Sequence, residues 1–427
     1  MTSAPLSAWP PAAAQCPATS QAPLGDWRLF RYKLAAHISR LLRWEFWPAW
    51  AIYSPLVPYL AYLALRYRGI TTCTLANPGI PLGGLVGESK WNILKLLPQN
   101  VIVPTTLIEP APLAQRVTAL KTIVRSQRWS WPIILKPDVG ERGTGVTLIR
   151  NEHEARIYLR LQPAAVLAQS YHPGPYEAGV FYVRMPGESA GRIFSLTNKR
   201  FPAVTGDGRS SIRTLIWRHP RYRVQASVFL NRLANEADRI PTAGERVQLG
   251  FMGNHCRGSM FLDGTDFITP ELTAAIDAIA HRTPGFYFGR FDIRYSNLEV
   301  FKAGRDFRIV ELNGLLSEST NIYDPAMGFW LAQAILRRQW HWAYRIGEAI
   351  RNQGAKQPGL TEVLAECHSH IQGRRQRAPE RQAPENECAL KPEVSAWPVP
   401  AIQNFESATG SNTHVVRPHQ NGRGPIL

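Results

Sequence analysis

"PIILKPDVGERGTGVTLI" (132–149) is the stretch that says most about the fold of this chain. An apolar run delivers Lys136, Pro137 ends it, and a loop with three glycines leads directly into a second β-branched run. Glycines allow backbone N–H groups to turn toward one point and bind an anion, and the lysine adds a positive charge beside them. No Gly-Lys-Ser/Thr triplet and no helix follow, so a Walker-type P-loop or a Rossmann turn is disfavoured. A glycine-rich hairpin turn beside a solvated lysine is the alternative interpretation.

Short β-branched runs and helical patterns alternate along the rest of the chain from about residue 70, with no internal repeat. The pattern predicts strands at 100–108, 132–137, 145–149, 165–171, 179–185, 191–201, 245–251, 286–296, 298–303 and 306–314. It predicts helices near 112–128, 151–161, 270–282 and 329–350. This mixture indicates a protein of the α+β class.

Two acidic spots end apolar runs in the last third of the chain, "GRFDIR" (289–294) and "VELNG" (310–314). Glu311 and Asn313 are two residues apart, so they project from the same face of a strand, as do Arg290 and Asp292. Carboxylate and amide oxygens suit Mg²⁺, and an arginine beside them suits a phosphate or a developing oxyanion. A β-hairpin whose polar residues face water is the alternative.

A further polar strand end occurs in "LAQSYHPGPYEAGVFYVR" (167–184). Backbone groups at such a strand end can bind the edge of an adenine. Glu177, just after a Pro-Gly turn, suits ribose hydroxyls or the ordering of the loop. Taken alone, the segment also fits a plain surface loop.

The bulk composition narrows the class of partner. The chain has 427 residues, 44% hydrophobic and 19% charged, enough for two or three globular domains. Its formal charge of +17 favours anionic partners. The five cysteines form no C-x-x-C pair, which fits a reducing compartment and argues against a zinc ribbon. His255 with Cys256, and "CHSH" (367–370), lack a second ligand pair at zinc spacing, so we expect structural or solvent-exposed roles for them. No module for specific nucleic-acid binding is evident.

The segment 46–65 is twenty residues without a charge, long enough for a membrane span, but Pro48, Pro55 and Pro58 interrupt it. The preceding 27–44 is basic and amphipathic, as in helices that lie on anionic membranes. Three interpretations stay open: a segment packed within the protein, contact with a membrane surface, and a true span. The N-terminus has no secretory signal pattern. We expect a cytoplasmic protein, with peripheral contact to the inner face of the membrane as one of these alternatives.

In order and spacing these motifs resemble an ATP-grasp domain over about residues 85–325. The match is similar to the branch that contains D-alanine–D-alanine ligase and the ATP-grasp half of cyanophycin synthetase, the latter through "VTGDGRSSIRTLI" (204–216). The resemblance implies two α+β subdomains that clasp ATP. It implies metal ligands Asp292, Glu311 and Asn313 for up to two Mg²⁺ ions, which Mn²⁺ can replace. The implied ATP-binding residues are Lys90, Lys136, Gly140, Arg142, Gly143, Thr144, Gly145, Gln169, Tyr171 and Glu177.

The resemblance assigns catalytic roles to Arg290 and to Lys199, with Arg200 as the alternative lysine equivalent. Arg257, Glu318 and Thr320 fall where the substrates would bind, together with Tyr323 and Asp324. The segment "GLLSESTNIYDP" (314–325) differs from the substrate loop of the dipeptide ligases, so D-alanine is not the expected substrate. The short N-terminal region is more similar to bacterial ATP-grasp proteins associated with cell-surface polysaccharide synthesis.

These observations predict a disordered arm at 1–26, a helical, aromatic region at 27–84, an ATP-grasp domain at 85–328, a closing amphipathic helix at 329–352 and a disordered tail at 353–427. The expected activity is ATP- and Mg²⁺-dependent ligation of a small carboxylate to an amine, or less readily to a thiol, through an acylphosphate. The alternative is a non-catalytic or sensory nucleotide-binding protein at the membrane surface, linked to cell-surface polysaccharide synthesis. The sequence does not indicate an oligomeric state.

Overall fold

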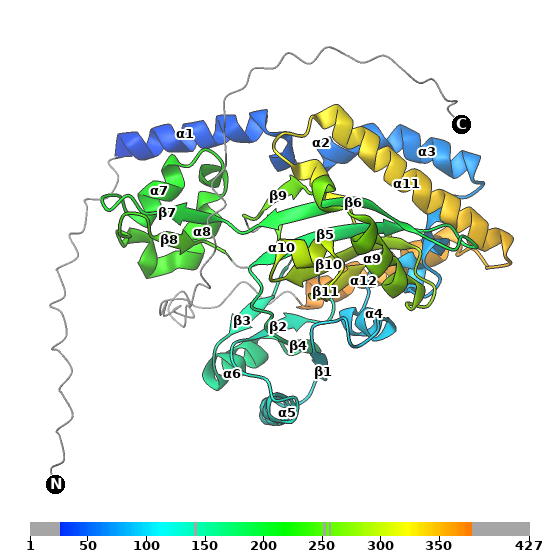
Figure 1. Ribbon diagram of the computed structural model, residues 1–427, viewed down its shortest axis with the longest axis horizontal. Coiled ribbons are helices and arrows are strands. Elements are labelled where there is room, and N and C mark those ends of the chain that lie inside the picture. Colours follow the sequence, from blue (N-terminus) through cyan, green and yellow to red (C-terminus); the bar gives the residue numbers. More distant parts are fainter. Residues whose placement is uncertain (1–25, 141–142, 251–252, 256–257, 378–427) are drawn as a thin grey trace, which may run out of the picture. The chain divides into compact units, whose positions relative to one another are not determined.

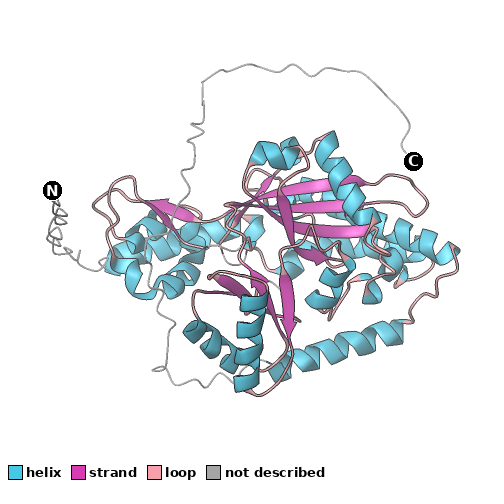
Figure 2. Ribbon diagram, turned by 60° about the horizontal axis from the view of Figure 1, so that its bottom comes forward, coloured by secondary structure: helices cyan, strands magenta, loops and turns pink. Residues whose placement is uncertain are grey.

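A computed structural model describes residues 26–140, 143–250, 253–255 and 258–377. Their strands form two principal sheets and a third, two-stranded sheet, and helices surround these sheets (Figure 1). Figure 2 shows the strands of the two principal sheets in magenta, with the short hairpin apart from them. The expected α+β class, with two α+β subdomains on either side of a cleft, is confirmed.

The smaller sheet contains the glycine loop. Its strand order is β1 (Thr105–Ile108), β4 (Val166–Ser170), β2 (Ile133–Pro137) and β3 (Thr147–Ile149). Helices α5 (Leu113–Ser126) and α6 (Glu152–Leu161) pack on one face through an apolar core that includes Ile133, Leu135 and Val166. Ile133 and Leu135 therefore face the helices. Lys136 and the loop that follows are left to face the larger sheet.

The larger sheet forms the floor of the molecule's main cleft. Its antiparallel strand order is β11 (Phe307–Asn313), β10 (Phe288–Tyr295), β5 (Tyr176–Val183), β6 (Arg192–Arg200) and β9 (Met260–Asp263). Helices α9 (Pro270–His281), α10 (Leu298–Lys302) and α4 (Lys90–Leu96) pack on one face, where Val180, Phe291 and Ile293 are buried. The opposite face of the sheet has an apolar end with Phe181 and Phe288 and a charged end with Arg290 and Asp292. The two ends are continuous.

The N-terminal region is a set of short helices rather than one long one. It comprises α1 (Asp26–Leu42), α2 (Ala49–Tyr53), α3 (Val57–Arg66) and intervening 3₁₀ turns at Trp44–Phe46, Ser54–Leu56, Thr72–Ala76 and Pro81–Gly83. Pro48 caps α2, Pro55 opens a 3₁₀ turn and Pro58 lies in the first turn of α3. In the part of the chain that the structure describes, no helix has the length and apolar character needed to cross a membrane.

Buried residues of this region pack against α11 (Phe329–Asn352), which covers the 329–352 range expected to be helical. Leu56 joins Leu336, and Leu63 joins Ala343 and Ile346. In Figure 1, α2, α3 and α11 run along the same edge of the view as α1. The N-terminal helices therefore pack against α11 as part of the folded protein.

A third unit follows the larger sheet's β6 strand. It contains the hairpin β7 (Ala203–Thr205) and β8 (Arg246–Gln248), helices α7 (Ile212–Arg218) and α8 (Ala226–Leu233), and 3₁₀ turns at Tyr222–Gln225 and Ala234–Asp238. Ile212, Ile216 and Phe229 form its core. The strand expected at 245–251 is confined to β8, and residues 251–252 lie outside the described residues.

Two further expected strands differ from the structure. The segment 298–303 is helix α10, because Asn297 caps its N-terminus by accepting from the N–H groups of Glu299 and Val300. The strand expected at 100–108 is only β1, because Pro104 has no N–H; Ile102 instead makes an isolated bridge to Ile309.

Helix α12 (Leu360–Arg377) lies within the tail that was expected to be disordered from 353. Val363 is buried, and His370 lines the main cleft. The surface of α12 is mostly polar and gives little hydrophobic periodicity, which is why the sequence pattern does not indicate it. Residues 378–427 lie outside the described part of the chain, as do residues 1–25 of the N-terminal arm.

Candidate active site

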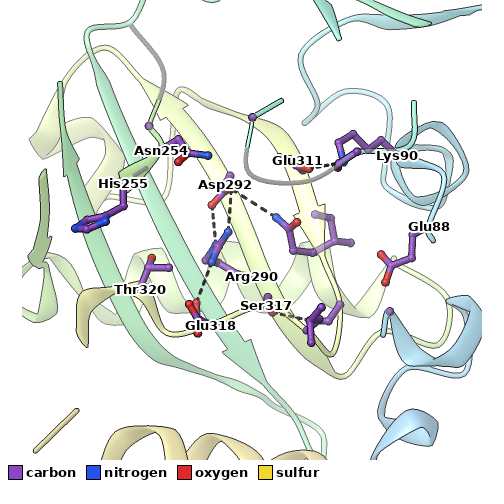
Figure 3. A pocket seen from close by; sticks show the side chains of 18 of the residues that line it. Glu88, Lys90, Asn254, His255, Arg290, Asp292, Glu311, Ser317, Glu318 and Thr320 are labelled. Atoms are coloured by element: carbon purple, nitrogen blue, oxygen red, sulfur yellow. Dashed lines mark hydrogen bonds and ion pairs between the residues drawn. The ribbon is translucent and has the colours of Figure 1, made fainter. Parts of the chain in front are cut away.

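A cleft of about 800 Å³ lies between the two principal sheets and the helices α2, α3 and α11. It brings together most of the residues that the sequence singles out (Figure 3). Those that line it are Lys90, Lys136, Gly140, Gly143, Thr144, Gln169, Tyr171, Glu177, Lys199, Arg290, Asp292, Glu311, Asn313, Glu318, Thr320 and Tyr323. Arg142 and Arg257 lie outside the described residues.

Asp292 on β10 is the centre of the charged floor. Arg290 donates to both of its carboxylate oxygens, from Nε to Oδ1 at 2.9 Å and from Nη2 to Oδ2 at 3.3 Å, and Lys199 Nζ lies 2.9 Å from Oδ1. Burial alone would raise the pKa of Asp292, but these two cations outweigh it and hold the pKa at about 2. Asp292 is therefore ionised at any physiological pH.

The side chains of Arg290, Asp292 and Lys199 can approach one another because a glycine on β5 leaves the space between them open. Gly179 pairs with Asp292 across the β5–β10 ladder. A Cβ at that position would lie 3.1 Å from Arg290 Cδ and 3.5 Å from both Asp292 Oδ1 and Lys199 Cε. In addition, the β10–β11 register shifts between Asp292 and Ile293. Such bulges re-aim side chains and are common next to functional sites.

Lys199 joins Asp292 to Glu177. Its Nζ donates to Glu177 Oε1 at 2.9 Å, and Arg294 Nε approaches Glu177 Oε2 at 3.3 Å. Burial lowers the pKa of Lys199, but Asp292 and Glu177 more than offset this and raise it. Arg200, the alternative lysine equivalent, is exposed on the opposite side of the strand. Both carboxylate oxygens of Glu177 thus hold cations, which accounts for the ordering of this strand end.

Lys90 connects the two subdomains. Its Nζ lies 3.2 Å from Glu311 Oε1 and donates to the carbonyl of Gly140 at 2.5 Å. The start of α4 fixes its position: Ser89 caps the helix, and Asp138 accepts from the N–H of Trp91. Burial would raise the pKa of Glu311, but Lys90 and then Lys136 lower it. The glycine loop and the metal-ligand candidate Glu311 are therefore held to one ammonium group.

Lys136 lies deeper in the cleft, and no carboxylate of the described residues is within hydrogen-bond distance of it. Its Nζ donates at 3.2 Å to Gln169 Oε1 and at 3.2 Å to the carbonyl of Val310. Burial lowers the pKa of Lys136 to about 8, against the attraction of Glu311. This ammonium is thus held by neutral oxygens, which leaves it able to gain from an anion in the cleft.

Only part of the glycine loop agrees with the anion-binding role expected from the sequence. Gly143 has φ +70° and Gly145 has φ +75°, conformations that favour glycine. Gly143 and Thr144 line the cleft, whereas Gly145 does not. A side chain at Gly145 would meet the ring of Pro137, and its carbonyl accepts from Tyr158 at 2.7 Å. Gly145 is therefore needed for packing of the loop against β2.

Glu318 lies at the opposite end of the site from the Lys90–Glu311 pair (Figure 3). Arg290 Nη1 donates to its carbonyl at 3.0 Å, and Gln339 of α11 accepts from the N–H of Ser319 and donates to the carbonyl of Ser317. The loop is therefore rigidly placed. The Glu318 carboxylate accepts only from Tyr323, at 3.1 Å to Oε2, and Oε1 is buried without a partner among the described residues. Burial raises the pKa of Glu318 to about 7.

The other acceptor-side candidates differ in environment. Thr320 lines the cleft and its hydroxyl lies 2.9 Å from that of Thr197. Asp324 accepts from the backbone N–H groups of Asp263 and Ala326 and does not line the cleft. Asp324 is thus part of the loop structure rather than of the site.

The chemistry of Asp292, Glu311 and Asn313 fits Mg²⁺. Asp292 pairs with Glu311 and Arg290 with Asn313 across the β10–β11 ladder, and all four line the cleft. Mg²⁺ takes few protein oxygens and leaves positions for phosphate oxygens and water. In the described residues no cluster of three or more His, Cys, Asp or Glu side chains is placed to hold a metal. Two carboxylates and one amide therefore suit an ion that is shared with a phosphate, and not a closed structural metal site.

Sequence reasoning missed two parts of the site. Arg294 continues the alternation of Arg290 and Asp292 on β10, a signal that was present in "GRFDIR". Glu45 had no such signal: it reaches the cleft from the turn before α2, where Arg221 Nη1 lies 2.6 Å from its Oε2 and His255 Nε2 lies 3.1 Å from it. His255 is structural in the sense that it belongs to this buried ion pair.

No protein-family model matches the sequence, and no curated protein matches it. Three solved structures align with parts of the chain. A bifunctional glutathione synthetase from Pasteurella multocida aligns with a TM-score of 0.34 and 17% identity over 60% of this chain and 38% of its own. D-cycloserine synthetase DcsG aligns with a TM-score of 0.35 and 11% identity over 73% of this chain and 94% of its own.

The D-Ala:D-Ser ligase VanG from Enterococcus faecalis aligns with a TM-score of 0.34 and 14% identity over 59% of this chain and 61% of its own. This chain therefore spans less than two thirds of the length of two of these three proteins. By their names, two of these proteins are synthetases and one is a ligase.

Proposed function

We propose that this protein is an ATP- and Mg²⁺-dependent ligase that joins a carboxylate to an amine, or less readily to a thiol, through an acylphosphate. One observation carries the proposal: Lys90, Lys136, Lys199 and Arg290 surround the oxygen donors Asp292, Glu311 and Asn313 in one cleft, and Lys90 links that cluster to the glycine loop. A triphosphate needs this combination of fixed cations, backbone donors and cation-binding oxygens.

Each charged group has a defined part in the proposed reaction. A carboxylate oxygen of the substrate attacks the γ-phosphorus of ATP, and the bond to ADP breaks. The amine nitrogen then attacks the acyl carbon, phosphate leaves, and the nitrogen loses a proton. Lys136, Lys90 and the glycine loop bind the phosphates, and Arg290 neutralises charge as it develops. Mg²⁺ held by Asp292, Glu311 and Asn313 would supply further charge neutralisation at the phosphate oxygens.

Calorimetric titration with ATP in the presence and absence of Mg²⁺ tests the nucleotide site. We expect Mg²⁺-dependent binding that Glu311→Gln weakens and that Glu271→Gln, on the outer helix α9, leaves unchanged. Absence of ATP binding, or binding indifferent to both Mg²⁺ and Glu311, would refute the ligase. Release of ADP and phosphate with pooled carboxylates and amines then separates an enzyme from the alternative, a sensory nucleotide-binding protein at the membrane.

We also propose that α1 contacts an anionic membrane surface. Most of its large apolar side chains face outward: Trp27, Phe30, Leu34, Ile38 and Leu41 are all at least half exposed, whereas Leu29 and Tyr32 are partly buried. Its partly buried positions include small residues such as Ala35, Ala36 and Ser39. This is the reverse of a helix that serves only the core. Arg28, Arg31, Lys33 and Arg40 flank the apolar stripe, so an anionic lipid surface complements it.

Co-sedimentation with vesicles tests this contact. We expect binding to vesicles with anionic lipid, weaker binding to purely zwitterionic ones, and loss of both after Trp27→Glu combined with Phe30→Glu. The matched control is Leu360→Glu with Leu364→Glu, two exposed apolar residues of α12. Equal sedimentation of the two double variants would end the membrane proposal.

A further inference from the structure

The main cleft continues beyond the charged floor into an apolar arm between α2, α3 and α11. Its lining, which we name the apolar arm, consists of Tyr53, Leu56, Val57, Leu60, Leu336 and Trp340. Leu56 and Leu336 are almost completely buried, whereas Val57 is 59% exposed and marks the open end. A phosphate or a small polar substrate gains nothing from such walls, so the triphosphate chemistry proposed above leaves the arm without a use.

Glu318 lies where the apolar arm joins the charged floor. On one side, its carbonyl accepts from Arg290. On the other, its carboxylate accepts from Tyr323, whose ring packs with the core that contains Leu56 and Leu336. The remaining oxygen, Oε1, is buried and has no partner among the described residues. A buried carboxylate oxygen without a donor is costly, and a ligand that supplies N–H donors would remove that cost.

The charge at the point where the apolar arm joins the charged floor determines which polar group of a ligand fits there. Glu45, the other carboxylate nearby, is matched by Arg221 and His255. Among the described residues the Glu318 carboxylate has only the neutral Tyr323 hydroxyl as a partner, so within that part of the chain it is the unmatched anion at the inner end of the apolar arm. A cationic or neutral amine complements it, and a second carboxylate does not. The carbon chain of such an amine would extend along the arm toward Val57.

We propose that the acceptor is an amphiphilic amine, with its nitrogen at Glu318 and an apolar chain in the apolar arm. This inference rests on the proposed ligase, since it names the class of its second substrate. Glu318 would accept a hydrogen bond from the neutral, nucleophilic amine and take up the proton that the nitrogen loses as its bond to the acyl carbon forms and phosphate leaves. The nitrogen would then be next to Arg290. Arg290 contacts Asp292 on the charged floor, where the acyl group would be activated.

Titration calorimetry with butyl-, hexyl- and octylamine, below micelle-forming concentrations and with and without Mg·ADP, tests the inference. We expect affinity to rise about three- to fourfold per methylene, the value for burial of a CH₂ group. Matched alcohols should bind more weakly. Glu318→Gln should reduce the amines to the level of the alcohols and leave the dependence on chain length intact.

Variants at exposed cleft-lining positions in the apolar arm or one helical turn from it avoid disruption of folding. Ala49, at the start of α2, is exposed and lines the cleft, so Ala49→Trp should weaken octylamine at least about tenfold while butylamine is little changed. Val57→Glu should act in the same direction. Leu65→Glu is the control, because Leu65 lies on α3, is 81% exposed and does not line the cleft.

The outcomes separate this inference from the proposed function. Mg·ATP binding without any preference for longer amines, or a preference that Glu318→Gln and Ala49→Trp leave unchanged, would overturn the amphiphilic acceptor while the ligase stands. Alkylamine binding by a chain that binds no Mg·ATP would instead refute the ligase and leave an amine-binding site. Competition between octylamine and Mg·ATP would place the chain in the nucleotide part of the cleft and would also overturn the arm.

Discussion

Asp292 and Glu318 line the same cleft and contact the same arginine, yet their surroundings give them opposite ionisation behaviour. Burial raises the pKa of both carboxyls. At Asp292 two cations reverse the effect and bring the pKa to about 2, whereas at Glu318 only a tyrosine hydroxyl opposes it and the pKa is about 7. Between these values Asp292 is a fixed anion, whereas Glu318 keeps its proton and loses it only as the pH passes about 7. Paired carboxyls of this kind commonly have different roles in catalysis.

Removal of the fixed anion should have the largest effect. Asp292→Asn deprives a metal ion of one ligand and leaves Arg290 and Lys199 with less countercharge. We expect the affinity for Mg·ATP to fall on the order of 100-fold, and the enhancement by Mg²⁺ to disappear. Calorimetric titration with and without Mg²⁺ measures both. Asp266→Asn, an exposed carboxyl outside the cleft, is the control. An Asp292 variant that still requires Mg²⁺ would show that the floor does not bind the ion.

Removal of the exchangeable proton should have a smaller, pH-dependent effect on stability. The native state holds the Glu318 proton more tightly than the unfolded state, so stability is lost as pH rises from about 4.5 through about 7. Glu318→Gln escapes this loss. We expect the variant to be more stable than the parent chain by about 1–2 kcal/mol at pH 8, with little difference at pH 4.5.

Thermal or urea unfolding of the two proteins across pH 4.5–8 measures this difference. Glu271→Gln, on the outer helix α9, should track the parent chain throughout the range. A constant difference between Glu318→Gln and the parent chain would mean that Glu318 titrates like an exposed carboxyl, and the contrast with Asp292 would then be lost.

Lys136 offers the smallest and most specific test. With a pKa of about 8 it is partly neutral at pH 8, and the phosphates of ATP should restore its proton. We therefore expect proton uptake on binding at pH 8 and an affinity that falls about fourfold between pH 7 and pH 8.5. Titrations in buffers of different ionisation enthalpy measure the uptake. Lys136→Met should abolish it, and Lys121→Met on the outer helix α5 should not.

The sequence predicts well those parts of the site that belong to single strands. Strand alternation places Arg290 beside Asp292 and Glu311 beside Asn313, and the structure has both pairs on the expected ladders. What it does not indicate depends on packing between distant segments. Glu45 and Arg221 are 176 residues apart, and no local pattern joins them. The turn chemistry of Asn297 also outweighs the β-branched pattern that predicted a strand at 298–303.

The position of Glu45 bears on whether the region before residue 85 can be separated from the rest of the protein. For the region before residue 85 the sequence left open whether the apolar segment 46–65 packs within the protein or contacts a membrane; in the structure the region supplies one carboxylate of a buried ion pair and much of one cleft wall. A shortened chain that begins at residue 85 would retain Arg221 with its partner carboxylate gone, and such unpaired buried charges cost several kcal/mol. The N-terminal helices are therefore not a detachable anchor, and transplanting the nucleotide site to another protein would require them as well.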